Sequence, residues 1–229
     1  MLKIYVIERN RLLDTNEYVF LYNFISEEKK KRIMKYRNYA DMERSLLADL
    51  LVRYAVNQKI DIPNSHLHFY QNDYGKPFLM FPNIHFNASH SGNWIACAVS
   101  DYEVGIDVEK ISHVDEDIAE HFFTEIENQY LKNQPDLLRK ESFYKLWTLK
   151  ESYIKFKGKG LSIPLDSFSI QIDKENISVF EGNTKQNCRF FLKPLPNAIL
   201  SICFLDKQIE KPHFFTIDDF SNHFFNSIY

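Results

Sequence analysis

A chain of 229 residues with 45% hydrophobic and 15% aromatic residues can fill one large hydrophobic core or two small ones, which excludes a disordered protein. The formal net charge of -3 gives no indication of a protein that binds nucleic acid or a membrane surface. Three widely spaced cysteines, a start without signal-peptide character and no run of transmembrane length lead us to expect reduced thiols and a cytoplasmic location.

The first part of the chain predicts a strand followed by basic helices. Leu2–Ile7 has the apolar character of an opening strand, and Ser26 precedes two glutamates in the manner of a helix N-cap. The helix that follows would carry the basic run Lys29–Asn38, and apolar periodicity predicts a second helix over Tyr39–Asn57. Basic runs of this kind are most often solvated helix faces or nonspecific anion sites.

Polar turns separate the next predicted strands. A short strand is expected at Leu67–Tyr70, a turn at Asn72–Gly75, and a longer strand in Ile84–Gly92 that ends in small polar residues. Ser89 and His90 lie at that end, where short donors and the backbone can approach a phosphate. We do not interpret them as a nucleophile and base, because a single histidine is more often structural and no third triad member is evident.

A clear period-two pattern lies in Val104–Ile111, after another predicted strand at Trp94–Val99. Its apolar residues alternate with polar ones, so that Asp107 and Glu109 project from the same strand face, about 6.5 Å apart along the backbone. Paired acidic residues on one strand face are often simply exposed to solvent and have no function. A third carboxylate from a helix would change their meaning, since clustered carboxylates repel one another unless a cation lies among them.

An amphipathic helix is predicted within Glu141–Gly160, where an apolar stripe recurs at helical spacing. The helix is expected to stop at Gly158, the first glycine after the stripe. Glu151 and Lys155 are four residues apart and therefore share a helix face. Taken alone, they would form an ordinary surface ion pair. Beside the two strand acids, Glu151 would complete an oxygen-only site with open positions, which suits Mg²⁺ because that ion keeps waters and bridges phosphates.

GIDVEK at Gly105–Lys110 and WTLKESYIK at Trp147–Lys155 together resemble the paired signature of the 4′-phosphopantetheinyl transferases. A single D-x-E motif would be weak evidence, whereas an ordered set of motifs at these separations is specific. The resemblance covers most of the chain and points to the longer, Sfp-type branch of that family. Further matching stretches are YGKP (74–77), HFNASHSGNW (85–94), HFFTEIE (121–127) and GKGLSIPLDSFSI (158–170).

The resemblance implies an α+β fold, a pseudo-dimer of two similar α/β halves within one polypeptide. The N-terminal half, residues 1–104, would contact the nucleotide and phosphates of coenzyme A. The C-terminal half, residues 105–229, would supply the metal site and the catalytic helix. Because no Pro/Ser-rich linker separates the halves, we expect them to pack tightly. Later strands are expected at 167–172, 177–180, 189–192 and 198–204.

Individual residues receive roles from the same resemblance. Asp107, Glu109 and Glu151 would hold Mg²⁺. Glu151 would also accept the proton of the acceptor serine, directly or through water, and Lys155 would stabilise the departing phosphate. The residues expected to bind coenzyme A are Lys29, Arg32, Arg44, Lys76, Ser89, His90 and Lys155.

The implied activity is transfer of 4′-phosphopantetheine from coenzyme A to a serine of an acyl or peptidyl carrier protein, releasing adenosine 3′,5′-bisphosphate. Such an enzyme would serve antibiotic or lipid biosynthesis, as a cytoplasmic monomer without nucleic acid or membrane partners. Two alternatives stay open. One is a Mg²⁺-dependent nucleotide phosphohydrolase or nuclease that uses the same acids, and the other is a nonenzymatic module that binds coenzyme A or a carrier.

Three further parts of the chain lead to predictions about burial and packing. His121, Phe122 and Phe123 are expected in the core, within a region (111–124) that the resemblance places near the carrier-docking surface. Glu127 is expected to be an exposed surface glutamate, with a polar contact near the metal as the alternative. The aromatic tail, His213–Tyr229, is expected to be a packing segment.

Overall fold

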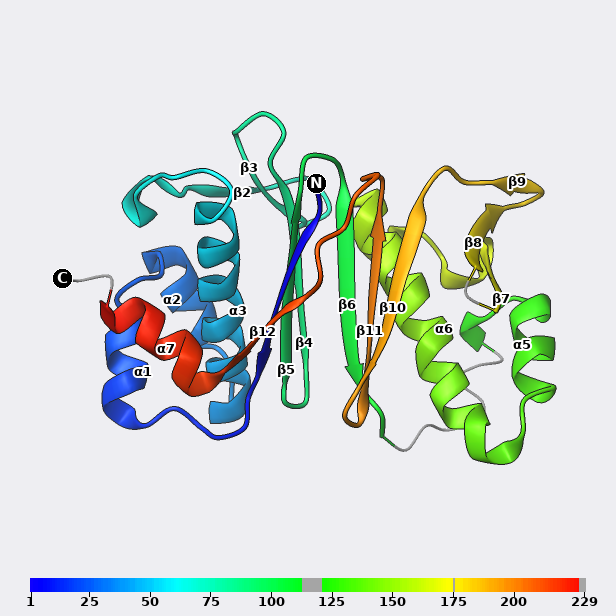
Figure 1. Cartoon of the computed structure of the whole chain (residues 1–229), viewed down its shortest axis with the longest axis horizontal. Coiled ribbons are helices and arrows are strands. Elements are labelled where there is room, and N and C mark those ends of the chain that lie inside the picture. Colours follow the sequence, from blue (N-terminus) through cyan, green and yellow to red (C-terminus); the bar gives the residue numbers. More distant parts are fainter. Residues whose placement is uncertain (113–120, 175, 227–229) are drawn as a thin grey trace.

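The structure, a computed structural model, describes residues 1–112, 121–174 and 176–226. Two sheets stand face to face in the middle of the molecule, with helices on the outer side of each (Figure 1). The elements of the first half are β1 (Lys3–Glu8), α1 (Thr15–Tyr22), α2 (Glu27–Ile33), α3 (Tyr39–Asn57), β2 (Phe69–Gln71), β3 (Pro77–Leu79), β4 (His85–Ser91) and β5 (Trp94–Ser100). The remaining elements are β6 (Val104–Lys110), α5 (Glu125–Lys132), α6 (Asp136–Lys157), β7 (Ser169–Asp173), β8 (Asn176–Glu181), β9 (Thr184–Lys185), β10 (Arg189–Leu195), β11 (Ala198–Phe204), β12 (His213–Thr216) and α7 (Ile217–Asn226).

The two central sheets share one strand order. The first runs β12-β1-β5-β4 and the second runs β10-β11-β6, so the opening strand of each half, β1 or β6, pairs with the last hairpin strand of that half. A long helix, α3 or α6, covers the outer face of each sheet (Figure 1). This arrangement confirms the expected α+β fold of two similar halves. Among the described residues, no helix combines the length and apolar character needed to cross a membrane.

Capping chemistry places the ends of the helices. Ser26 accepts a hydrogen bond from the backbone N–H of Lys29 and begins α2, as expected. Asn38 begins α3 in the same way, and the helix occupies the predicted range, Tyr39–Asn57. In the second half, α6 ends at Gly158, which adopts the left-handed conformation with φ of 69° that glycine tolerates without strain.

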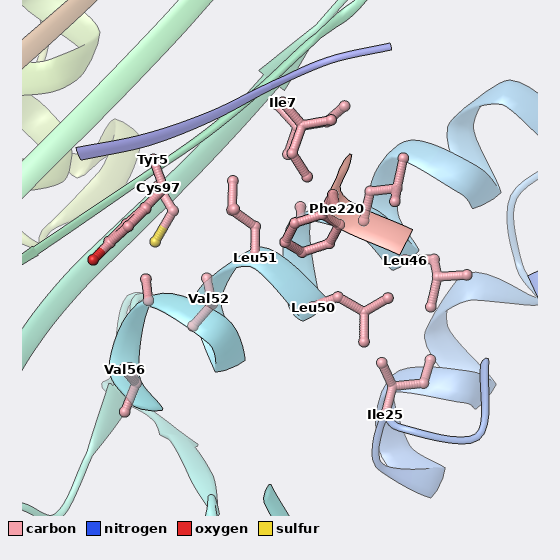
Figure 2. Packing of buried hydrophobic residues seen from close by; sticks show 14 of the residues in the cluster. Tyr5, Ile7, Ile25, Leu46, Leu50, Leu51, Val52, Val56, Cys97 and Phe220 are labelled. Carbon is pink, nitrogen blue, oxygen red and sulfur yellow. The ribbon is translucent and has the colours of Figure 1, made fainter. Parts of the chain in front are cut away.

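Alternate residues of the central strands face different cores. Tyr5, Ile7 and Cys97 point toward the helices of the first half, where they pack with Leu51 and Val56 of α3 (Figure 2). The intervening strand residues face the second sheet, since successive side chains of a strand point to opposite sides. Their interlocking apolar surface joins the halves tightly, as expected from the missing linker. The residues of this middle core include Ile4, Val6, Ala96, Ala98, Ile106, Val108, Leu200 and Ile202.

The C-terminal segment returns to the first half. β12 pairs in parallel with β1, and α7 buries Ile217, Phe220 and Phe224 against the helices of that half (Figure 2). The tail up to residue 226 is therefore a packing segment, as predicted. In space it lies with the N-terminal half, although the expected division groups it with residues 105–229.

Gly105 allows α6 to lie directly on β6. A Cβ atom at this position would come within 2.1 Å of the carbonyl oxygen of Ser152 and 2.2 Å of the amide nitrogen of Phe156. Both are backbone atoms of α6, so no side-chain rotation could relieve the contact. The missing side chain therefore sets the distance between the strand that carries Asp107 and the helix that carries Lys155.

We expect Gly105→Ala to destabilise the protein strongly, because the helix must move away from the strand. Overpacking in a core typically costs about 1–3 kcal/mol, and we expect the upper end of that range because the clash is with backbone. Urea unfolding measures the loss. The neighbouring Ile106→Val is the control and is expected to cost about 0.5–1.5 kcal/mol. Equal effects of the two substitutions would contradict the close approach.

Candidate functional site

A pocket of about 520 Å³ lies in the first half, between α2, α3, the β2–β3 hairpin and the end of β4. Its volume lies within the range typical of small-molecule sites. Flat apolar side chains line part of the wall and positive charge gathers on another part. The apolar lining includes Tyr36, Val52, Phe69, Tyr70 and Phe86, and the basic lining consists of Lys29, Arg32, Arg53, His68 and His90.

The cations of this pocket are not equally available. Arg53 donates to Asp49 over 2.6 Å and lies 5.0 Å from the ring centre of Phe69, so its charge is already engaged. No described residue forms an ion pair with Lys29 or Arg32. Burial lowers the pKa of Lys29, as expected for an ammonium group withdrawn from water. The positive charges of Lys29 and Arg32 are therefore available to bind an anionic ligand.

His90 lies at the side of the pocket nearest the second half. Burial lowers its pKa to about 4, and the charges of Arg44, Lys29 and Lys155 contribute in the same direction. The imidazole is thus neutral at pH 7 and surrounded by positive charge. An anion bound there would reduce the repulsion that keeps it neutral.

Acid should destabilise the protein through His90. Because its folded pKa lies below the ordinary value of 6.5, its neutral form contributes stability that is complete above pH 6.5 and is lost as the pH falls toward 4. We expect the free energy of unfolding to fall over this window in the wild type and to fall less in His90→Gln. Urea unfolding at several pH values measures the slope, and the exposed His66→Gln serves as control. An unchanged slope in His90→Gln would contradict the assignment.

Arg44 and Lys76, two further predicted phosphate contacts, do not line this pocket. Arg44 pairs with Asp41 and donates to the carbonyl oxygen of Gly92 over 3.3 Å, although its charge acts on His90. The ammonium of Lys76 lies 2.7 Å from a carboxylate oxygen of Glu103. It borders a second, smaller cavity of about 230 Å³. Of the predicted coenzyme A residues, the pocket therefore brings together Lys29, Arg32 and His90.

Asp107 is the centre of a second constellation, formed where β4, β6 and α6 meet. The side chain is almost completely buried, and its Oδ1 accepts from Lys155 Nζ at 2.6 Å and from Ser89 Oγ at 2.9 Å. Lys155 Nζ also lies 3.1 Å from Ser89 Oγ. The interpretation of Glu151 and Lys155 as an ordinary surface ion pair is thus wrong, because Lys155 reaches across to the strand acid instead.

Glu109 and Glu151 lie in the electrostatic field of Asp107. Ser91 Oγ donates to Glu109 over 2.7 Å. Burial raises the pKa of Glu109 to about 7, and Asp107 and Glu151 add to the rise. Burial also raises the pKa of Glu151, again with Asp107 as the next cause. Asp107 therefore makes ionisation of both glutamates less favourable, and Glu151 adds to this effect on Glu109.

The donor set of this cluster fits a hard divalent cation. Oδ2 of Asp107 is buried without any hydrogen-bond partner, and both glutamates have raised pKa values. These are the signs of carboxylates that lack positive charge, which an ion with oxygen ligands supplies. Among the described residues, no three ligating side chains already form a metal cluster, and Lys155 lies on Asp107.

The structure contradicts the predicted exposure of Glu127. This residue is fully buried and accepts from Lys150 Nζ at 2.6 and 2.7 Å, from the N–H of Ile170 at 2.7 Å and from Thr124. Lys150 also donates to the carbonyl oxygen of Phe168 at 2.7 Å and is itself fully buried. The pair ties α6 to α5 and β7. The sequence feature that could have indicated this buried pair was Lys150, which falls within the apolar stripe of the predicted helix.

The segment before α5 is only partly described. Phe123 is buried, as predicted, and packs with Phe143 and the partly buried Trp147. His121 and Phe122 are exposed, so the prediction of a core position is wrong for these two residues. Much of the expected docking region, 113–120, lies outside the described residues.

The comparisons with known proteins match the parts of the chain that contain the pocket and the acid cluster around Asp107. A family model described as "4'-phosphopantetheinyl transferase, N-terminal" matches residues 14–101, and one described as "4'-phosphopantetheinyl transferase superfamily" matches residues 103–203. The chain is 44% identical to the 4'-phosphopantetheinyl transferase gsp of Aneurinibacillus migulanus, over 76% of this chain and 73% of that protein. It is 39% identical to the 4'-phosphopantetheinyl transferase Sfp of Bacillus subtilis (strain 168), over 76% and 78% of the two chains.

Proposed function

The chain belongs to the 4′-phosphopantetheinyl transferases, and from this membership we propose that it moves 4′-phosphopantetheine from coenzyme A to a serine of an acyl or peptidyl carrier protein. One observation carries the proposal. A partly buried cluster of acids with Lys155 lies beside a pocket in which Lys29 and Arg32, which form no ion pair with described residues, suit a phosphorylated nucleotide. Adenosine 3′,5′-bisphosphate is the other product.

The pocket binds the nucleotide end of coenzyme A. Lys29 and Arg32 supply positive charge for its 3′-phosphate, because a doubly charged phosphate needs several donors and guanidinium offers a fork of them. Flat side chains such as Phe69 and Tyr70 offer apolar surface to the adenine. His90 lines this site and lies in the field of Arg44. Lys76 would have to leave Glu103 to reach a phosphate.

Asp107, Glu109 and Glu151 would hold Mg²⁺, and the partnerless oxygen of Asp107 supports this assignment. A divalent ion held by these residues would supply positive charge to offset the negative charge that develops on the pyrophosphate.

Glu151 and Lys155 carry the proton and charge movements of the reaction. Glu151 accepts the proton of the acceptor serine, directly or through water. Because a bound cation lowers the basicity of a ligating carboxylate, the route through water reconciles its two roles. The serine oxygen then bonds to the phosphorus of phosphopantetheine, and the bond from that phosphorus to the bisphosphate breaks. Lys155 stabilises the negative charge left on the departing phosphate through a preorganised ammonium group.

The enzyme works as a monomer in the cytoplasm. The monomer is supported by the fact that the pocket and the acids come from the same chain. The location is supported by coenzyme A as donor and by three free cysteines, Cys97, Cys188 and Cys203. Carrier proteins of antibiotic or lipid biosynthesis are the acceptors.

Incubation of the purified protein with coenzyme A, Mg²⁺ and a panel of apo carrier proteins tests the function. We expect the carrier mass to rise by one phosphopantetheine group. Removing divalent ions with a chelator should lower the rate more than about 100-fold, since a catalytic metal supplies several kcal/mol, and Mg²⁺ should restore it. Nucleotide cleavage without a carrier would favour a phosphohydrolase, and binding without turnover would favour a nonenzymatic module.

A further inference from the structure

The turn between β2 and β3 contacts the end of α6 across the two halves. Asn72 Nδ2 donates to the carbonyl oxygen of Gly158 over 2.8 Å. Its Oδ1 accepts from the backbone N–H groups of Tyr74 at 3.0 Å and Lys76 at 2.9 Å. One amide side chain therefore fixes the shape of the turn and also binds the C-cap of a helix more than eighty positions later in the chain.

Lys76 strengthens the same contact. Its ammonium donates to the carbonyl oxygen of Val104 at 3.2 Å and lies 3.5 Å from that of Phe156. The last carbonyl groups of a helix have no partner within the helix and need one from outside. At α6 the turn of the other half supplies these partners, through Asn72 to Gly158 and through Lys76 to Phe156.

The same turn forms part of the wall of the nucleotide pocket. Gln71 and Gly75, on either side of Asn72 in the chain, both line that pocket, as do Tyr70 and Pro77. The hairpin and the C-terminal end of α6 lie at the same edge of the molecule, the upper one in Figure 1. The turn thus has the pocket on one side and the end of the helix that carries Lys155 on the other.

We propose that Asn72 is a positioning residue, which couples a filled nucleotide pocket to the placement of Lys155 at the end of α6. The inference rests on the proposed function and adds to it a link between donor binding and the catalytic helix. Lys155 lies three positions before Gly158, so a shift of the helix end at Gly158 moves the Lys155 ammonium relative to Asp107. Small misplacements of this kind lower a catalytic rate more than they lower binding.

Two variants at this position separate the turn from the contact between the halves. Asn72→Ala removes all three hydrogen bonds of the side chain. Asn72→Asp keeps the acceptor oxygen that binds Tyr74 and Lys76, and it replaces the donor to Gly158 with a negatively charged oxygen that cannot donate. The control is Asp73→Ala, at an exposed residue of the same turn whose carboxylate forms no ion pair or hydrogen bond with the described residues.

For both Asn72 variants we expect kcat to fall about tenfold, with the affinity for adenosine 3′,5′-bisphosphate changed by less than about threefold. Asp73→Ala should keep both values. In a Lys155→Ala background, Asn72→Ala should have no further effect on kcat, because the residue acts through Lys155. Loss of affinity without loss of kcat, or an equal loss of kcat in both backgrounds, would overturn the positioning role.

Hydrogen exchange tests the coupling without any carrier or turnover. Adenosine 3′,5′-bisphosphate should slow amide exchange at residues 154–160 of the wild type and of Asp73→Ala, but not of Asn72→Asp or Asn72→Ala. The same protection in all four proteins would overturn the inference. If the wild type fails to modify any carrier but shows this difference, the proposed function fails while the coupling stands.

Discussion

Glu151→Ala is expected to abolish transfer while the fold remains intact. The substitution removes the carboxylate that accepts the serine proton, a contribution of typically about 10²–10⁴-fold in rate. It also removes one of the three acids of the proposed cation site, so the total loss should exceed the loss of the base alone. Because Glu151 has a raised pKa in the native state, replacing it relieves repulsion with Asp107, and the protein should be no less stable.

The carrier mass assay at long incubation times measures the rate of this variant. Glu141→Ala is the matched control, since Glu141 lies on the same helix and only pairs with Lys145 on the surface. Circular dichroism and thermal unfolding of both variants should match the wild type. A folded Glu151→Ala protein with wild-type turnover would remove Glu151 from the mechanism.

Lys150→Ala is expected to lower the free energy of unfolding by about 3–5 kcal/mol, because it leaves the carboxylate of Glu127 buried without its counter-charge. Such a loss is a large part of the about 5–15 kcal/mol that stabilises a typical protein. Urea unfolding provides the measurement. Lys145→Ala breaks an exposed pair four residues apart on the same helix and should cost no more than about 1 kcal/mol.

A double variant keeps the Lys150 experiment decisive if the single one fails to fold. Lys150→Met with Glu127→Leu removes both charges together, and replacing a buried pair by apolar residues is often neutral or stabilising. We therefore expect the double variant to be more stable than Lys150→Ala. A double variant as unstable as the single one would show that packing, and not the unpaired carboxylate, determines the loss.

Local chemistry made much of the fold predictable. Period-two alternation identified β6, and apolar periodicity identified α3 over its full length. The stop of α6 at Gly158 followed from the one residue type that adopts a positive φ without strain. The conformation of each of these elements depends on residues close to it in the sequence, so local patterns are enough to predict it.

Long-range partners were not predictable in the same way. The buried state of Glu127 depends on Lys150, twenty-three positions later, and a capping motif on a short helix looks like a surface feature by itself. The return of β12 and α7 to the first half depends on pairing with β1 at the opposite end of the chain. Composition and spacing contain no record of such contacts between distant segments.

The candidate site was predictable from the sequence only in part. The two acids of β6 were placed on one face by alternation alone, but their meeting with α6 depends on the space that Gly105 leaves for that helix. Lys155 was expected to face a phosphate, and its ammonium lies on Asp107. This contact joins residues forty-eight positions apart in the chain, so no local pattern predicts it.

A crystal structure with Mn²⁺ and adenosine 3′,5′-bisphosphate tests the central claim most directly, since Mn²⁺ shares the oxygen ligands of Mg²⁺ and can be located by its anomalous scattering. We predict one anomalous peak bounded by carboxylate oxygens of Asp107, Glu109 and Glu151, with the nucleotide between Lys29 and the β2–β3 hairpin and with Lys155 released from Asp107. A nucleotide bound in the pocket with no ion among the three acids, or with the ion held elsewhere, would contradict the account.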